Sequence, residues 1–257
     1  MPTYTKPKPA GTPTWTDLTT PDVEAARNFY HAVFGWEYDI AGPEYGGYTT
    51  ARLGTLPVAG LTSPWQGAPP QPAAWLMYFA SDNAQADAAR ALALGATVLA
   101  PAMQVGEFGS MAVLADPTGA PFGFWQAGRH IGWQIAEEFS AAAWLELYSP
   151  DAKRARDFYA SLTGLTADPI PGGMEYYVLK RGEDMLAGIM QADPAWGKTP
   201  AHWVTYFSVK NADETAATVK KHGGKQMGNV EDSPFGRLAA LADPQGAIFK
   251  VVEPPKQ

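Results

Sequence analysis

The chain has 257 residues, of which 46% are hydrophobic and 18% are charged, and its net charge at pH 7 is −7. This composition indicates folded domains with real cores and argues against a disordered chain or a coiled coil. The negative charge, without a cluster of Lys and Arg, argues against a surface for nucleic acid or anionic membrane. The lack of cysteine excludes disulfides, thiolate metal sites and a thiol nucleophile.

The N-terminal residues, MPTYTKPKPA, lack the apolar core of a secretion signal, and no apolar run approaches the length of a membrane span. We therefore expect a cytoplasmic protein with no membrane partner. Residues 1–13 hold four prolines and little apolar material, which predicts an extended N-terminal arm.

A long internal repeat follows the arm. The stretch from Trp15 to Trp36 recurs 129 positions later, from Trp144 to Leu165, and both copies place Phe-Tyr ahead of a glycine. A repeat whose period is a whole domain indicates a tandem duplication. We predict one domain at 14–126, a linker at 127–139 and a second domain at 140–254.

The first copy has a regular order of predicted elements. Alternation over 14–19 predicts a strand, and Asp22 and Gly35 are placed to begin and end a helix with one apolar stripe. A pair of strands is predicted next, at 48–53 and 57–62. The pattern then restarts with a strand at 74–80, a helix at 83–94, a short strand at 97–100 and a hairpin of strands at 110–115 and 121–126. The second copy repeats this order, with its restarting strand at 203–209, its helix at 213–222 and its last strand at 247–253.

These features resemble the glyoxalase / bleomycin-resistance / extradiol-dioxygenase superfamily, also called vicinal oxygen chelate. The resemblance is carried by the acid-Leu strand, the Asp-headed helix with Phe-Tyr, the Gly-Trp exit and the Asp-Pro-X-Gly-Ala hairpins at 116–120 and 243–247. Residues 123–132, GFWQAGRHIG, are similar to tandem actinobacterial glyoxalase-like proteins. The resemblance implies an α+β fold of two glyoxalase-like domains, each built from two βαβββ units that form an open cup. It also implies an internal pseudo-dimer, in a chain that is monomeric or homodimeric.

Enzymes of this superfamily hold a divalent metal ion on His and Glu residues. Carried over to this chain, their ligand places fall on Trp15, Gly60, Leu76 and Gly123 in the first half, and on Trp144, Gly188, Val204 and Lys250 in the second. None of these is an ordinary metal ligand. We therefore expect no metal ligands and no cofactor. A divalent metal ion stays open as an alternative, on a non-standard set of Glu146, His202 and Glu253.

Three residues are candidates for catalysis. Asp17 and Glu146 share the cup-facing side of their strands with tryptophans, and a carboxylate on such an apolar face is costly unless it is paired. Each carboxylate either orients a ligand or acts as a general base. The alternative is a structural role, in which it pairs with a nearby Arg such as Arg52 or with backbone N–H groups at a helix start. His202, at the head of its strand, is the third candidate, with a plain rim histidine as the alternative.

Aromatic residues on the strands are candidates for ligand binding, because they can stack on a flat organic molecule. Ordinary core packing is the alternative for any one of them, and Trp75 and Tyr78 have opposite parity. The predicted ligand-binding residues are Trp15, Tyr78, Trp125, Trp144, Tyr206 and Lys250. We expect the remaining histidines to be structural or solvated: His31, His130 and His222.

Two functions remain open. The first is a metal-free protein that binds a small hydrophobic or aromatic compound, as the resemblance to the bleomycin-resistance branch implies. The second is a metal-dependent lyase of the glyoxalase type, or a dioxygenase, with non-standard ligands. The missing ligands and the abundant tryptophan favour the first. Divergence between the halves, such as Gly123 against Lys250, is consistent with one cup that binds and one that supports the fold.

Overall fold

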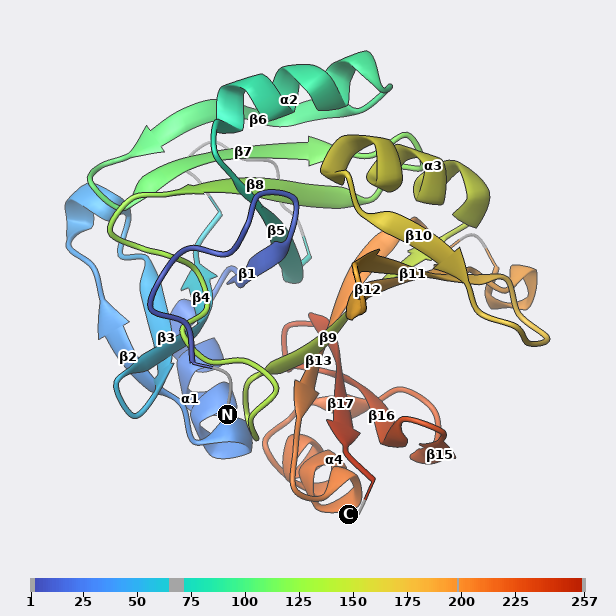
Figure 1. Cartoon of the computed structure of the whole chain (residues 1–257). Coiled ribbons are helices and arrows are strands. Elements are labelled where there is room, and N and C mark those ends of the chain that lie inside the picture. Colours follow the sequence, from blue (N-terminus) through green and yellow to red (C-terminus); the bar gives the residue numbers. More distant parts are fainter. Residues whose placement is uncertain (1–2, 65–71, 198, 256–257) are drawn as a thin grey trace.

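The computed structural model describes residues 3–64, 72–197 and 199–255. The chain forms two large, curved, mixed sheets, each with two helices (Figure 1). This confirms the predicted α+β class and the tandem βαβββ units. Among the helices of the described residues, none has the length and apolar character needed to span a bilayer.

The first sheet has the strand order β2-β3-β4-β1-β5-β8-β7-β6, with β1 and β5 antiparallel at its centre. Its elements are β1 (Pro13–Thr19), α1 (Val23–Phe34), β2 (Glu37–Ile40), the 3-10 helix η1 (Pro43–Tyr45), β3 (Thr49–Leu53), β4 (Leu56–Thr62), β5 (Ala74–Ser81), α2 (Ala84–Ala93), β6 (Thr97–Val105), β7 (Gly109–Ala115) and β8 (Pro121–Ala127).

The second sheet repeats this order as β10-β11-β12-β9-β13-β17-β16-β14, with β15 paired to β16. Its elements are β9 (Ala142–Ser149), α3 (Ala152–Thr163), β10 (Thr166–Pro169), β11 (Tyr176–Arg181), β12 (Asp184–Gln191), the 3-10 helix η2 (Pro194–Trp196), β13 (His202–Ser208), α4 (Ala212–Lys221), β14 (Lys225–Gln226), β15 (Glu231–Ser233), β16 (Gly236–Ala242) and β17 (Ile248–Glu253).

Some strands differ from the sequence-based expectation. The edge strand predicted at 97–100 continues to Val105, because irregularities in its pairing with β7 let it bend along the sheet. The short edge strands β2 and β10 were not predicted, since each has only four residues and most of them are exposed. The N-terminal arm folds back along the segment before β9, where Thr3 pairs with Ile135.

The repeated motif builds the same helix start and end twice. The side chain of Asp22 accepts a hydrogen bond from Ala25 N at 2.9 Å, and that of Asp151 accepts one from Arg154 N at 3.0 Å. The glycine after each helix has φ 71°, the left-handed conformation that glycine adopts without strain. The local chemistry that predicted α1 and α3 is therefore present in both halves.

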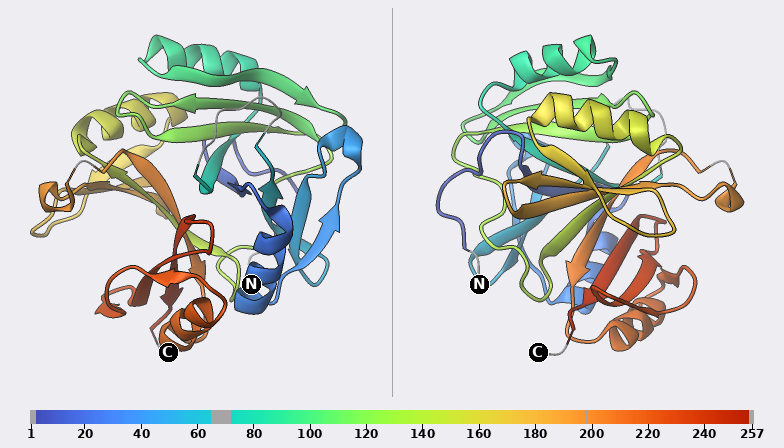
Figure 2. Two further views of the ribbon diagram at one scale, coloured as in Figure 1. Left: turned by 180° about the vertical axis from the view of Figure 1, so that it is seen from behind. Right: turned by 45° about the vertical axis from the view of Figure 1, so that its right-hand side comes forward.

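The two halves pack with their helix-bearing sides together, so that α1 lies beside α4 and α2 beside α3 (Figure 2). Two reciprocal contacts cross this interface. The Tyr30 hydroxyl donates to Asp243 at 3.2 Å, and the Tyr159 hydroxyl donates to Asp116 at 3.0 Å. The Tyr of each repeated helix thus binds the Asp-Pro turn of the other half. This reciprocity is the signature of a two-fold interface, here within one chain.

The reciprocal contacts predict a stability effect. Replacing Tyr30 or Tyr159 with Phe leaves a buried aspartate with one donor fewer, so each variant should lose about 1–2 kcal/mol of unfolding free energy. Tyr45→Phe is the matched control, because Tyr45 lies away from the interface against Phe108. Denaturant unfolding measures all three, and a loss no greater than in the control would contradict the interface role.

Candidate ligand-binding site

The face of each sheet opposite its helices carries the candidate residues, and we name these faces cup 1 for the first sheet and cup 2 for the second. Strand alternation puts Leu18, Leu145 and Leu147 on the helix side, where each is at most 2% exposed. It puts Trp15 with Asp17, and Trp144 with Glu146, on the cup side. Each cup therefore has one acidic residue on its central strand.

In cup 1, Asp17 is held by tyrosines. Its carboxylate accepts hydrogen bonds from Tyr78 at 3.1 Å and from Tyr48 at 3.4 Å, while the Trp15 indole N–H donates to Tyr48 at 2.9 Å. Burial raises the pKa of Asp17 to about 7, and the two tyrosine hydrogen bonds oppose that rise. A large fraction of this carboxyl group is therefore protonated at neutral pH.

Cup 1 is filled by the protein's own side chains. The chain after β8 brings the His130 ring to 4.4 Å from Trp15 and 5.4 Å from Trp125, between ring centroids. Burial lowers the pKa of His130 to about 4, so this imidazole is neutral. The two far edges of the sheet also meet, since Tyr45 of η1 packs on Phe108 of the β6–β7 turn at 5.1 Å.

In cup 2, the corresponding carboxylate has more partners and a cation. Glu146 is only 7% exposed and accepts from Tyr176 at 2.8 Å, and from Tyr148 and Tyr206 through its other oxygen. Lys250 donates to Tyr206 at 2.9 Å and to Tyr148, and its ammonium lies 3.9 Å from Glu146. Burial lowers the pKa of Lys250, and the charge of Glu146 opposes this. A linked polar cluster thus forms at the base of cup 2.

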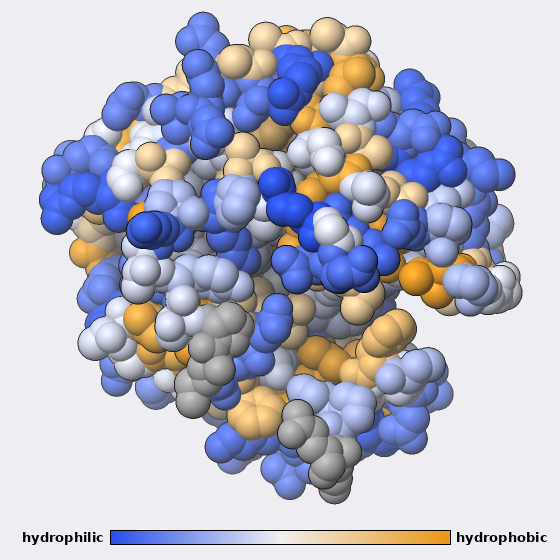
Figure 3. Space-filling view, in the orientation of Figure 1, coloured by the Kyte–Doolittle hydropathy of each residue, from blue (hydrophilic) through white to orange (hydrophobic). Residues whose placement is uncertain are grey.

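Cup 2 is open. Figure 3 shows the molecule hollowed between the β10–β11 and β15–β16 ends of this sheet. The Lys250 side chain remains 23% exposed, so the cluster reaches solvent. The rings of His202 and Trp196 lie 5.5 and 5.8 Å from that of Tyr148, and His202 is stacked on it. Apolar residues are exposed nearby, including Trp196 at 50% and Phe235 at 71%.

The described residues of the two cups do not form an ordinary ligand set for a divalent metal ion. At two of the ligand places named above, Gly60 and Gly188, an added Cβ would overlap the hydroxyl of Tyr48 or Tyr176. The tyrosines therefore occupy the space that a ligand side chain would need. In cup 2 the Lys250 ammonium already faces the carboxylate, and across the described ranges no three His, Cys, Asp or Glu residues are grouped for a metal ion.

Two expectations about these residues are wrong. Glu253 does not join Glu146 and His202, because its carboxylate accepts from Ala212 N at 3.0 Å, at the start of α4. The ring of His202 instead contacts the Pro200 carbonyl at 2.8 Å. The suggested pairing of Asp17 with Arg52 also fails, since Arg52 contacts Asp39 at 2.7 Å.

The remaining predicted residues fall in two groups. Trp15, Tyr78 and Trp125 lie with Asp17 in cup 1, whereas Trp144, Tyr206 and Lys250 lie with Glu146 in cup 2. Four cup residues were missed or assigned no site role: Tyr48, His130, Tyr148 and Tyr176. Tyr48 and Tyr176 are equivalent in the structure, since each donates to the carboxylate of its own cup, but they are 128 positions apart, so the repeat at 129 positions did not align them.

Comparisons with known proteins agree with this architecture. A glyoxalase-like domain model matches residues 15–125, and the model of the Glyoxalase/Bleomycin resistance protein/Dioxygenase superfamily matches residues 141–251. The chain is 40% identical to “Putative glyoxylase CFP32” of Mycobacterium tuberculosis over 253 residues, which covers 96% of each chain. The chain belongs to this superfamily.

Other members differ more in sequence. “Anthracycline biosynthesis protein DnrV” of Streptomyces peucetius is 35% identical over 257 residues, covering 95% of this chain and 93% of that one. Among solved structures, the Mn(II)-bound glyoxalase from Novosphingobium aromaticivorans matches with a TM-score of 0.66 at 14% identity, over 95% of this chain and 82% of that one. The 2,3-dioxygenase LapB from Pseudomonas sp. KL28 matches with a TM-score of 0.65 at 13% identity, over 95% of this chain and 92% of that one. At these low identities, the two solved structures show that the fold is shared and nothing more.

The buried carboxyl of cup 1 predicts a pH effect. The pKa of Asp17 rises from an ordinary 3.8 to about 7 on folding, so between these pH values the folded chain binds more protons than the unfolded one. The contribution of Asp17 to stability is therefore greatest below about pH 4 and falls as pH rises to about 7. Asp17→Asn should remove that fall and be the more stable protein at pH 8. Unfolding of both proteins from pH 4 to 8 measures it, and parallel pH profiles would refute it.

The glycines beside the two carboxylates predict a packing effect. Gly60→Ala and Gly188→Ala force a methyl group onto a tyrosine hydroxyl, so each should cost about 1–3 kcal/mol of unfolding free energy. Gly172→Ala is the control, because its added Cβ meets no atom within 4 Å. If all three variants unfold alike, the tyrosines do not fill the space beside the carboxylates.

Proposed function

We propose that cup 2 binds a flat aromatic compound that carries an acidic hydroxyl, carbonyl or carboxylate group, and that it does so without a metal ion. The observation that carries this proposal is the polar cluster of Glu146, Lys250 and three tyrosines at the base of an open cup. We further infer that the chain acts in the cytoplasm, as a monomer whose two halves serve as its own pseudo-dimer.

The cluster has the chemistry to orient such a ligand. An ammonium has three N–H donors, and Lys250 uses two of them on Tyr148 and Tyr206. Among the described residues the third N–H has no acceptor, so it can meet a ligand oxygen, and the positive charge favours a phenolate, an enolate or a carboxylate. Glu146 accepts from all three tyrosines and so fixes their hydroxyl groups for this contact.

The walls of cup 2 suit a planar ring system. Trp196 is 50% exposed, and Trp144, Tyr176 and His202 are half-buried, so part of each of these rings is open to a ligand. Stacking on such rings is favourable for aromatic ligands. The name of DnrV connects a relative to anthracycline biosynthesis, and anthracyclines are flat, fused-ring phenols and quinones. This supports the proposed ligand class.

Cup 1 has a different role in this proposal. In cup 1 the residue paired with Tyr78 is Gly123, whereas in cup 2 the residue paired with the equivalent Tyr206 is Lys250. Cup 1 therefore has no cation at this position. His130 and the contact between Tyr45 and Phe108 occupy and close it. We infer that cup 1 stabilises the fold while cup 2 binds.

The proposal predicts separable effects of variants in the two cups. Titration with 1,4-dihydroxyanthraquinone should quench tryptophan fluorescence saturably. Lys250→Met and Glu146→Gln should weaken binding about tenfold or more, because each leaves a buried charge or hydroxyl unpaired. Asp17→Asn, the matched change in cup 1, should leave the affinity unchanged. Equal losses from changes in both cups, or no saturable quenching, would contradict the proposal.

A further inference from the structure

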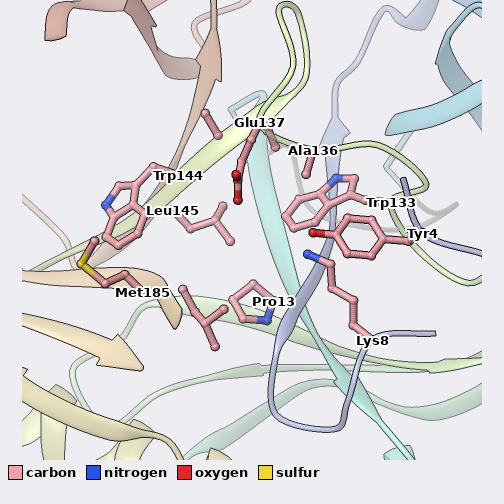
Figure 4. A pocket seen from close by; sticks show the side chains of 12 residues that line it. Tyr4, Lys8, Pro13, Trp133, Ala136, Glu137, Trp144, Leu145 and Met185 are labelled. Carbon is pink, nitrogen blue, oxygen red and sulfur yellow. The ribbon is translucent and has the colours of Figure 1, made fainter. Parts of the chain in front are cut away.

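A separate cavity of about 80 Å³ lies where the N-terminal arm meets the segment before β9 and the ends of β9 and β12 (Figure 4). We call it the arm cavity. Tyr4 and Lys8 of the arm line one side, Trp133 and Glu137 another, and Trp144 and Met185 close it. It is not the polar cluster of cup 2, although Trp144 takes part in both.

Lys8 is the notable group in the arm cavity. Its ammonium lies 4.5 Å from the centre of the Tyr4 ring and 5.0 Å from that of Trp133. Burial lowers the pKa of Lys8 to about 8, and Glu137 opposes that shift. Over the residues with described positions, no carboxylate oxygen comes within 4.0 Å of this ammonium. Lys8 is half-buried, and a cation that is partly removed from water is costly unless it finds an anion.

Glu137 faces the same cavity from the other segment. Its φ is 61°, a left-handed conformation that costs a residue with a side chain free energy, and such strain gathers at functional places. Figure 4 shows its carboxylate directed into the space that the Lys8 ammonium and the Tyr4 hydroxyl also face. The indole N–H of Trp133 is buried, and within the described part of the chain it has no hydrogen-bond partner.

We propose that the arm cavity binds a small zwitterion of the α-amino acid type. Lys8 and the Tyr4 hydroxyl would receive its carboxylate, and Glu137 its ammonium. Opposite charges from two segments face one space without touching each other, whereas a purely structural ion pair would close directly. A space of about 80 Å³ is far smaller than a site for a drug-sized molecule but holds more than a single water. Met185 and Leu145 line the cavity, where they would contact a short apolar side chain of the ligand.

Calorimetry on the whole chain tests this proposal with three probes: L-alanine, sodium acetate and methylammonium chloride. L-alanine should bind saturably, and each of the other two, which carries one charge only, should bind at least about tenfold more weakly. Lys8→Gln and Glu137→Gln should each weaken L-alanine binding about tenfold or more. Lys6→Gln, two residues away on the exposed arm, should not change it.

Two further measurements test the proposal even if an arm-cavity variant folds poorly. In the unaltered chain, L-alanine should slow modification of Lys8, but not of Lys6, by an amine-reactive reagent. Lys250→Met should bind L-alanine normally, so the arm cavity can fail or stand independently of cup 2. Equal affinity for acetate and L-alanine would overturn the proposal, as would unchanged labelling of Lys8 or undiminished binding by Glu137→Gln.

Discussion

A carboxylate buried on the central strand of each sheet is the constraint around which both cups are built. Asp17 and Glu146 sit on faces where charge is costly, and tyrosines from neighbouring strands satisfy them. Three of these tyrosines lie where a glycine leaves room for the ring or hydroxyl: Tyr48 at Gly60, Tyr78 at Gly123 and Tyr176 at Gly188. Each cup therefore has a hydrogen-bonded acid on the central strand of its sheet.

The two halves satisfy this constraint in different ways. In cup 1 burial raises the pKa of the Asp17 carboxyl, and His130 and its aromatic neighbours close the space. In cup 2 the Lys250 ammonium compensates the charge, and the cup stays open. The first copy thereby adds a packed core, whereas the second keeps a polar cluster that reaches solvent. The reciprocal contacts of Tyr30 and Tyr159 hold both copies in one body.

Local sequence patterns predicted the family, the helices, most strands and the acidic residue in each cup. Capping aspartates and alternating strands act over a few residues, so they can be read without the fold. The partners of the acids could not be found in this way. Tyr48 reaches Asp17 only through the pairing of β3, β4 and β1, and His130 depends on the path of the chain after β8. Tyr148 has Thr19 as its counterpart, so the repeat gave no signal for it.

The central claim is that hydrogen bonds and Lys250 replace a metal ion in this member of the superfamily. Elemental analysis of the untagged whole chain tests it most directly, after incubation with Mn, Fe, Ni or Zn salts and removal of free ions. The account predicts far less than one equivalent of any of these metals, with no change after treatment with a chelator. One tightly held equivalent that a chelator removes, and that Glu146→Gln no longer binds, would contradict it.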